Sequence, residues 1–474
     1  MNHLNTNAQA PSARALAYQA LYDILEKGAY SNLRLQTALK KNHLKGPEAH
    51  LLTELVYGTL RKYNYLVWII SRLSSHPVKK IHPAVRILLC IGLYQLIYLS
   101  RIPESAAVNE TVKIAKKITH PGNVRFINGV LRNFLRKKEQ FELPKRESNP
   151  LLYDELFYNM PGWLVQKWQK ELGPEKTDLI LKAFNEVPDT SIRVNTLRTD
   201  TQSVLKLLSE KGVEAQQSDF YSPAIILKHG ADQFFAEILN KGYASVQSVS
   251  SMIPPVVLSP EPGERVLDMC AAPGSKTTEM AELMNNEGHI DAWDLYDHRV
   301  QLIKESAHKL GIKIIHAEVQ DSTVLNDSCN EEYDKVLLDA PCSGLGVLGH
   351  KLEIRWNRKE ADIKEFPILQ KKLISTAAHY VKHGGVLVYS TCTLNKQENE
   401  SVVKWFIDNF TDFELEEDSE YRKRLRENRN QAIRNLEERN KDKRHMERER
   451  LASYGLCIGM LLFIAKTGAN LDTA

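Results

Sequence analysis

The fold is decided by the stretch Val266-Leu-Asp-Met-Cys-Ala-Ala-Pro-Gly-Ser-Lys-Thr277 of this 474-residue chain. Its first residues belong to an apolar strand predicted over residues 265–268, and the small residues after Asp268 form a turn that opens a helix. Backbone can approach a ligand closely at such a turn. The turn matches neither a Walker A loop nor a complete Gly-x-Gly-x-x-Gly fingerprint, so a nucleotide phosphate is not its natural ligand.

Apolar runs alternate with helical segments on both sides of this stretch, from residue 240 onward. Strands that are buried on both faces of a parallel sheet have such runs. The pattern therefore predicts a doubly wound, Rossmann-like α/β domain that binds its ligands at the carboxyl ends of the strands. The predicted strands are residues 265–268, 289–294, 313–316, 335–339 and 385–390.

Acidic residues follow this strand pattern. Asp268, Asp294 and Asp339 end three of the predicted strands, and Asp321 lies in the loop after the 313–316 strand. A positively charged sulfonium attached to an adenosine suits such a site, with Asp294 accepting hydrogen bonds from the ribose hydroxyls. The alternative is that each acid merely caps a helix.

Two cysteines lie in loops at the ends of predicted strands. Cys342 is part of Asp339-Ala-Pro-Cys-Ser-Gly344, and Cys392 is part of Ser390-Thr-Cys-Thr393. Adjacent strands bring such loops side by side. Carbon 5 of cytosine is too weak a nucleophile to attack a methyl sulfonium until a thiolate has added to carbon 6. Asp339 could bond the edge of the base, but the spacing does not say which thiol attacks.

The remaining sequence features exclude several classes of protein. The four other cysteines have neither a Cys-x-x-Cys pair nor a His at metal spacing, so we expect free thiols and no metal. The N-terminus lacks an apolar signal segment, and the longest apolar run, residues 87–99, is too short to cross a membrane. We therefore expect a cytoplasmic protein. These four cysteines are Cys90, Cys270, Cys329 and Cys457.

Length and composition predict several domains, with 43% hydrophobic and 26% charged residues. Residues 1–145 have apolar side chains at helical spacing and form a helical bundle. Residues 146–238 combine a helical linker with a small antiparallel α+β unit. Residues 239–474 hold the doubly wound domain. Its charged stretch at 420–450 is either a solvated helical insertion or a basic arm on RNA.

Positive charge is concentrated in the first third of the chain. The net charge of the whole chain is +4, yet residues 1–150 hold 23 Lys and Arg against 9 Asp and Glu. This excess predicts an RNA-binding surface, and a surface that only solubilises the protein is the alternative. The basic residues that crowd together are Lys113, Lys116, Lys117, Arg125, Arg132, Arg136, Lys137 and Lys138.

Motifs along most of the chain resemble those of one enzyme family. They are Arg101-Ile-Pro-Glu-Ser-Ala-Ala-Val-Asn-Glu110, Phe126-Ile-Asn-Gly-Val-Leu-Arg132, Arg193-Val-Asn195, Cys270-Ala-Ala-Pro-Gly274, Asp339-Ala-Pro-Cys-Ser-Gly-Leu-Gly-Val347 and Ser390-Thr-Cys-Thr393. With them the chain resembles the bacterial 16S ribosomal RNA cytosine-C5 methyltransferases of the RsmB (Sun/Fmu) type. The resemblance implies a NusB-like helical domain, a small ferredoxin-like or RRM-like domain and a methyltransferase domain.

The resemblance also implies the roles of individual residues. Cys392 would be the nucleophile and Cys342 the helper for product release, with Asp339 as the third catalytic residue. S-adenosylmethionine would be bound by Cys270, Ala271, Ala272, Pro273, Gly274, Ser275, Lys276, Asp294, Asp321 and Asp339. The substrate would be 16S ribosomal RNA, free or in an assembly intermediate, contacted by Arg125, Arg132, Arg193 and Asn195. We expect a monomer that binds no membrane and no metal.

The chain departs from the family pattern at a few positions, which are Ser248, Val249, Ser275, Gly349 and His350. Two other functions stay open. The same chemistry could act on transfer RNA, or the protein could be a non-catalytic RNA-binding assembly factor. The intact Asp339, Cys342 and Cys392 argue against the non-catalytic factor.

Overall fold

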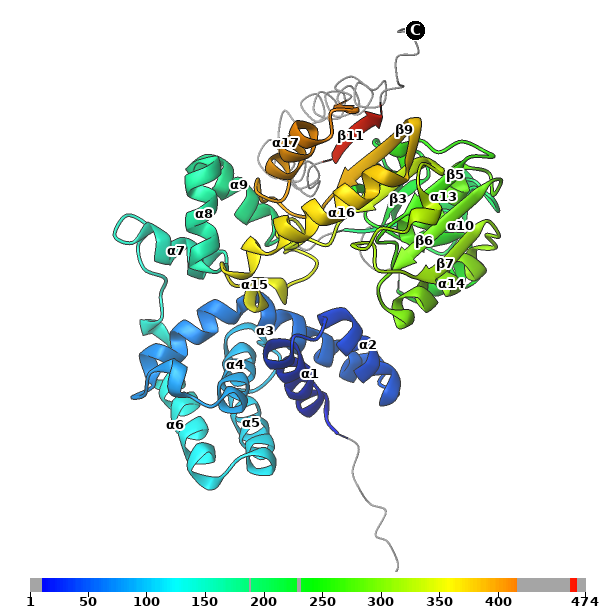
Figure 1. Cartoon of the computed structure of the whole chain (residues 1–474). Helices are drawn as coiled ribbons and strands as arrows, with labels where there is room; N and C mark the ends of the chain where they lie inside the picture. Colours follow the sequence, from blue (N-terminus) through cyan, green and yellow to red (C-terminus); the bar gives the residue numbers. More distant parts are fainter. Residues whose placement is uncertain (1–10, 187–188, 228–231, 416–460, 467–474) are drawn as a thin grey trace, which may run out of the picture. The chain divides into compact units, whose positions relative to one another are not determined.

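The computed structural model describes residues 11–186, 189–227, 232–415 and 461–466 (Figure 1). The chain forms two compact units, each made of two segments. The first unit contains Met1–Glu186 and Leu348–Glu360, and the second contains Val187–Val347 and Ala361–Ala474. The charged stretch at 420–450 lies outside the described residues. Among those described, no helix is both long and apolar enough to span a membrane.

The first unit is helical. Its central helix, α4, is buried along most of its length and begins at Pro83, a residue whose fixed φ suits the first helical position. This helix contains most of the long apolar run and confirms that the run is a core helix. The main helices are α1 (Ala13–Lys27), α2 (Ser31–Lys41), α3 (Gly46–Leu73), α4 (Pro83–Tyr98), α5 (Glu104–Ile118), α6 (Pro121–Lys137), α7 (Pro150–Phe157), α8 (Gly162–Leu172) and α9 (Pro174–Ala183).

The helical unit extends past the predicted boundary at residue 145 and ends at Glu186. The Asn64 side chain on α3 donates hydrogen bonds to the carbonyls of Glu155 and Met160, so α7 and the turn after it belong to the bundle. A segment from the catalytic part of the sequence, Leu348–Glu360 with α15 (Ile354–Asn357), also belongs to this unit. There the Trp356 indole donates to the carbonyl of Leu60 at 2.9 Å.

The second unit begins with a small sheet that is antiparallel, as the sequence predicts, and its strand order is β2-β3-β1-β4. With its two helices it has the β-α-β-β-α-β order of ferredoxin-like domains. The sheet extends beyond the predicted boundary at 238, because β4 pairs with β1. The elements are β1 (Thr190–Val194), α10 (Thr201–Glu210), β2 (Ala215–Gln217), β3 (Ala224–Leu227), α11 (Asp232–Asn240) and β4 (Ala244–Val246).

Within the described residues, the larger sheet has seven strands in the order β10-β11-β9-β8-β5-β6-β7. Five of them are parallel, and β11 pairs antiparallel with both β9 and β10. The strand order reverses at β5, where doubly wound sheets bind their ligands. The strands are β5 (Arg265–Asp268), β6 (His289–Asp294), β7 (Ile315–Val319), β8 (Tyr333–Asp339), β9 (Val381–Ser390), β10 (Phe413–Leu415) and β11 (Leu461–Lys466).

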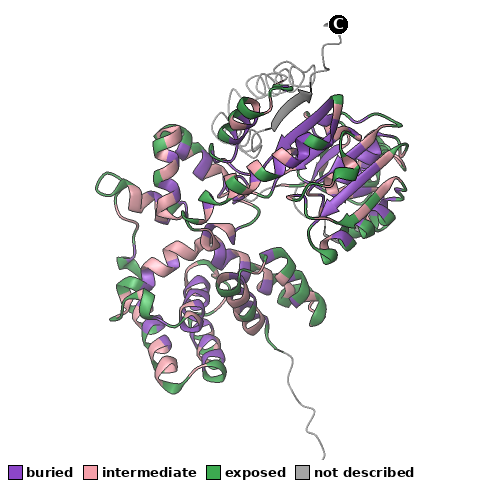
Figure 2. Ribbon diagram, in the orientation of Figure 1, coloured by how far each residue is buried: buried purple, intermediate pink, exposed green. Residues whose placement is uncertain are grey.

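Both faces of the central parallel strands β5, β6 and β8 are largely buried, whereas the edge strand β7 is partly exposed (Figure 2). Alternate residues contribute to two cores because successive side chains of a strand point to opposite faces. Leu267 packs with residues of α16 (Phe366–Tyr380) and α17 (Glu400–Asn409). Its neighbour Val266 packs with α12 (Val249–Leu258), α13 (Ser275–Leu283) and α14 (Asp297–Leu310). The double burial fixes the strand ends that carry the site.

Candidate active site

The turn between β5 and α13 forms the floor of the candidate site. Gly274 has a φ of +98°, and a Cβ at this position would lie 3.1 Å from the Cα of Ile303, so a larger residue is excluded. Asp268 is buried and accepts a hydrogen bond from Thr277 at 2.7 Å, while its other oxygen has no partner among the described residues. Burial raises the pKa of Asp268 to about 7. This turn and the first turn of α13 contain the predicted cofactor residues 270–276.

Two further acids lie at the ends of neighbouring strands. Asp294, at the end of β6, is buried and pairs with Arg299 at 3.2 Å. Asp321 follows β7 and accepts hydrogen bonds from the backbone and hydroxyl of Thr323, which lower its pKa. Asp268 and Asp294 do not cap the helices that follow them, since the N-cap residue of α13 is Gly274 and that of α14 is Tyr296. The helix-capping alternative is therefore wrong for Asp268 and Asp294.

An ion pair links the cofactor turn to the end of β8. The Lys276 ammonium donates to Asp339 at 2.7 Å, and the Ser390 hydroxyl at the end of β9 donates to the other oxygen of Asp339 at 2.7 Å. Burial lowers the pKa of Lys276, but Asp339 and, more weakly, Asp268 and Cys392 raise it, and the net shift is upward. Lys276 therefore carries its positive charge close to Cys392.

The two cysteines lie in contact. The sulfur atoms of Cys342 and Cys392 are 3.2 Å apart, and the backbone N–H of Cys392 donates to the sulfur of Cys342 at 3.3 Å. The hydrogen bond to Cys392 and then burial raise the pKa of the Cys342 thiol. Burial and the neighbouring carboxylates of Asp268 and Asp339 also raise the pKa of Cys270. The Lys276 ammonium, whose side chain is 16% exposed, interacts with the Cys392 thiol.

The residues predicted to contact RNA lie in two different environments. Arg125 and Arg132 are exposed on α6, seven residues apart and so on one face of the helix. Arg193 and Asn195 are fully buried, and their predicted contact with RNA is wrong. Asn195 donates to the carbonyls of Gly242 and Leu310, each at 2.9 Å.

Arg193 connects the small sheet to the cofactor helix. Its guanidinium bonds Glu282 at 2.8 and 2.9 Å, the carbonyl of Ser275 at 2.7 Å and the hydroxyl of Thr278 at 3.0 Å. Glu279 lies 3.5 Å from the same group. Arg193 thus holds the first turns of α13 in place. Sequence spacing gave no sign of this role, because its partners follow more than 50 residues later.

The polar turn before α17 was not predicted from the sequence. Asn395, Glu398 and Asn399 are all buried there. Glu398 accepts a hydrogen bond from Ser343 and Asn399 accepts one from Thr391, while Asn395 donates to Glu398 within the turn. The available signal was a cluster of polar side chains directly after the Ser390-Thr-Cys-Thr393 motif.

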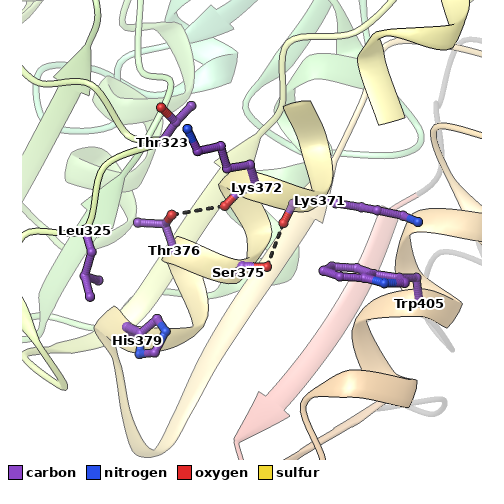
Figure 3. A pocket seen from close by; sticks show the side chains of 8 residues that line it. All are labelled: Thr323, Leu325, Lys371, Lys372, Ser375, Thr376, His379 and Trp405. Atoms are coloured by element: carbon purple, nitrogen blue, oxygen red, sulfur yellow. Dashed lines mark hydrogen bonds between the residues drawn. The ribbon is translucent and has the colours of Figure 1, made fainter. Parts of the chain in front are cut away.

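A separate pocket of about 390 Å³ lies beside the loop after β7 (Figure 3). The Lys371 ammonium covers the ring of Trp405 at 4.9 Å from its centroid. The hydroxyls of Ser375 and Thr376 donate to carbonyls of their own helix, α16. The pocket does not include either cysteine loop, so we assign it no catalytic role. Its lining residues are Thr323, Leu325, Lys371, Lys372, Ser375, Thr376, His379 and Trp405.

Comparison with known proteins agrees with this arrangement. Residues 255–445 match a family model described as 16S rRNA methyltransferase RsmB/F. Residues 11–136 match the NusB family, and residues 160–233 match an RsmF/B-like ferredoxin-like domain.

Whole-chain relatives give the same result. A probable ribosomal RNA small subunit methyltransferase B of Bacillus subtilis is 38% identical over 85% of this chain and 90% of its own length. The ribosomal RNA small subunit methyltransferase B of Klebsiella pneumoniae is 35% identical over 85% of this chain and 91% of its own length. The crystal structure of PH0851 is similar with a TM-score of 0.74 and 30% identity, covering 85% of this chain and 91% of that one. The chain therefore belongs to the RsmB family of ribosomal RNA methyltransferases.

Proposed function

We propose that this RNA methyltransferase transfers a methyl group to carbon 5 of a cytosine in 16S ribosomal RNA, through a covalent bond between Cys392 and carbon 6. The observation that carries the proposal is the pair of thiols 3.2 Å apart, next to the Lys276–Asp339 ion pair at the carboxyl ends of β8 and β9. The names of its relatives support small-subunit ribosomal RNA as the substrate.

The residues around the β5–α13 turn fit S-adenosylmethionine as the methyl donor. The turn excludes a side chain at Gly274, one buried oxygen of Asp268 lacks a partner among the described residues, and the buried Asp294 offers acceptors for ribose hydroxyls. When bound, this cofactor supplies a methyl group on a positively charged sulfonium. The loop residues 270–276 with Asp294 and Asp321 would hold it, and Asp339 would lie between cofactor and base.

Cys392 is better suited than Cys342 to attack the base. The cation of Lys276 lies close enough to stabilise a thiolate on Cys392, while the pKa of Cys342 is raised. Attack by Cys392 on carbon 6 forms the S–C6 bond and moves electron density to carbon 5, which can then take up a methyl group. Asp339 has lone pairs left beside its two donors to accept a hydrogen bond from the base.

Cys342 then has a role in product release. The largest cause of its raised pKa is the hydrogen bond to the Cys392 sulfur, and that sulfur is an uncharged thioether in the adduct. The adduct removes that cause, so Cys342 gives up its proton to solvent more readily after attack than before it, and as a thiolate it can take the proton from carbon 5. The electron pair of that C–H bond re-forms the C5–C6 double bond, and the S–C6 pair returns to Cys392.

Methylation of unmodified 16S ribosomal RNA with S-adenosylmethionine labelled in its methyl group tests the proposal. After digestion to nucleosides, we expect the label in 5-methylcytidine for the wild type and for Cys329→Ala, whose thiol lies outside both cysteine loops. Cys392→Ala should give none. Label in any other nucleoside, or transfer to transfer RNA alone, would contradict the proposal.

A further inference from the structure

We propose that Glu398 is the positioning residue that fixes the two cysteine loops relative to each other, an inference that rests on the proposed function of the thiols. Glu398 lies in the turn before α17, six residues after Cys392 and 56 after Cys342 in the sequence. It acts through the residues next to the two sulfur atoms.

The carboxylate of Glu398 is fully buried and accepts hydrogen bonds from residues of three segments. Ser343, directly after Cys342, donates both its backbone N–H, at 2.8 Å, and its hydroxyl. Asn395, from the loop that follows Cys392, donates at 2.8 Å. Gln370 on α16 donates at 3.1 Å and uses its second N–H for the carbonyl of Pro341 at 3.0 Å. One side chain thus collects donors from the Cys342 loop, from α16 and from the turn that directly follows the Cys392 loop.

A direct hydrogen bond between the loops depends on this carboxylate. The hydroxyls of Ser343 and Thr393 are 2.7 Å apart, and each belongs to the residue that follows a site cysteine. A serine hydroxyl has a single proton, and Ser343 gives that proton to Glu398, so Thr393 must be the donor between the two hydroxyls. Glu398 therefore sets the direction of the bond that joins the loops.

Backbone contacts also restrict movement of the two cysteine loops relative to each other. The N–H of Gly346 donates to the carbonyl of Cys392 at 2.9 Å, and a Cβ at Gly346 would lie 2.8 Å from the same oxygen. Asn399, the residue after Glu398, accepts a hydrogen bond from the Thr391 hydroxyl at 2.6 Å and donates one to the carbonyl of Thr393 at 3.0 Å. Both sides of Cys392 are held in this way.

The chemistry of the site needs an acceptor without protons of its own. A carboxylate offers two oxygens and no donor, whereas a glutamine would turn an N–H group toward groups that are already donors. Because Glu398 is fully buried, its carboxylate depends on these hydrogen bonds for stabilisation. Its charge also favours the neutral thiol at Cys342.

The test compares Glu398→Gln with Glu400→Gln, an exposed glutamate two residues away that loses the same charge. The first readout uses no RNA and no cofactor. The protein is equilibrated with oxidised and reduced glutathione, and mass spectrometry measures the fraction of Cys342–Cys392 disulfide, which gives the effective concentration of one thiol at the other. We expect a fall of about 10-fold or more for Glu398→Gln and none for Glu400→Gln.

The second readout is steady-state methylation of 16S ribosomal RNA. We expect kcat to fall about 10- to 100-fold in Glu398→Gln, with the KM for S-adenosylmethionine unchanged, because the cofactor turn is not part of the network. If the variant does not fold, Ser343→Ala is measured in its place, since it removes the bond between the loops and keeps the carboxylate.

The outcomes separate this inference from the proposed function. If Glu398→Gln kept the wild-type effective concentration and the wild-type kcat, Glu398 would contribute only to stability, whatever the melting temperature of the variant. This result would overturn the inference. If the wild type formed no 5-methylcytidine, the proposed function would fail, and the glutathione equilibrium would still decide whether Glu398 positions the two thiols.

Discussion

Helix α6 and strand β1 both carry arginines, and they use them in opposite ways. Arg125 and Arg132 are exposed on α6 of the helical unit. Arg193 on β1 is fully buried and bonds two glutamates of the cofactor helix. Exposed guanidinium groups keep their hydration and can exchange counterions for phosphates, whereas a buried one must be fully paired. The surroundings of each arginine, and not the residue type, therefore decide whether it can bind RNA or whether it supports the candidate site.

The largest effect expected from this comparison is on stability. Arg193→Met should lower the free energy of unfolding by about 3 to 5 kcal/mol, because it leaves Glu279 and Glu282 buried without their cation. Denaturant unfolding measures the change. Lys241→Met, which breaks an exposed pair with Glu237 in the same unit, should leave the midpoint unchanged.

The same variant also tests whether Arg193 contributes to RNA binding. If Arg193→Met unfolded like the wild type but the folded protein bound RNA more weakly, the buried arginine would belong to the RNA interface after all.

A smaller effect is expected at the cofactor turn. Asp294→Ala should weaken binding of S-adenosylmethionine by about 1.5 to 3 kcal/mol, because a ribose hydroxyl would lose a charged acceptor. Titration calorimetry measures the affinity, and Asp297→Ala, an exposed acid at the start of α14, is the control. Equal affinities for Asp294→Ala and the wild type would remove Asp294 from the site.

The smallest effect concerns the exposed pair on α6. Arg125→Ala and Arg132→Ala should each weaken RNA binding modestly and lower the slope of log affinity against log salt by about 1, since each phosphate contact releases its counterion. Filter binding at several salt concentrations gives the slopes. Lys404→Ala, an exposed lysine on α17, removes the same charge from the other unit. Identical slopes for all three variants and the wild type would mean that the charge of α6 only solubilises the protein.

Local features of the fold were predictable from the sequence. Apolar runs identified the parallel strands, and the acids at their ends identified the edge of the sheet where Asp294 and Asp339 lie. The contact between the cysteine loops followed from strand ends that meet at one edge. Each of these features depends on residues close together in the sequence or on a general property of parallel sheets.

Features that depend on distant partners were not predictable. Arg193 is buried because Glu282 lies opposite it, 89 residues later. Residues 348–360 join the helical unit because the Arg355 guanidinium bonds the carbonyl of Asn159, 196 residues earlier, and that of Phe184. The role of Glu398 depends on Ser343, 55 residues before it. Periodicity and composition contain no information on which distant side chains will meet.

We propose different roles in catalysis for the two neighbouring thiols, and a denaturing gel tests this proposal. Cys342→Ala, incubated with 16S ribosomal RNA and S-adenosylmethionine, should keep the RNA covalently attached, because Cys392 can add to the base and the release step lacks its helper. Cys392→Ala should leave no adduct and no methylated RNA. A shifted band from Cys392→Ala with none from Cys342→Ala would reverse the two roles, and methylation by both variants without any adduct would contradict covalent catalysis by either cysteine.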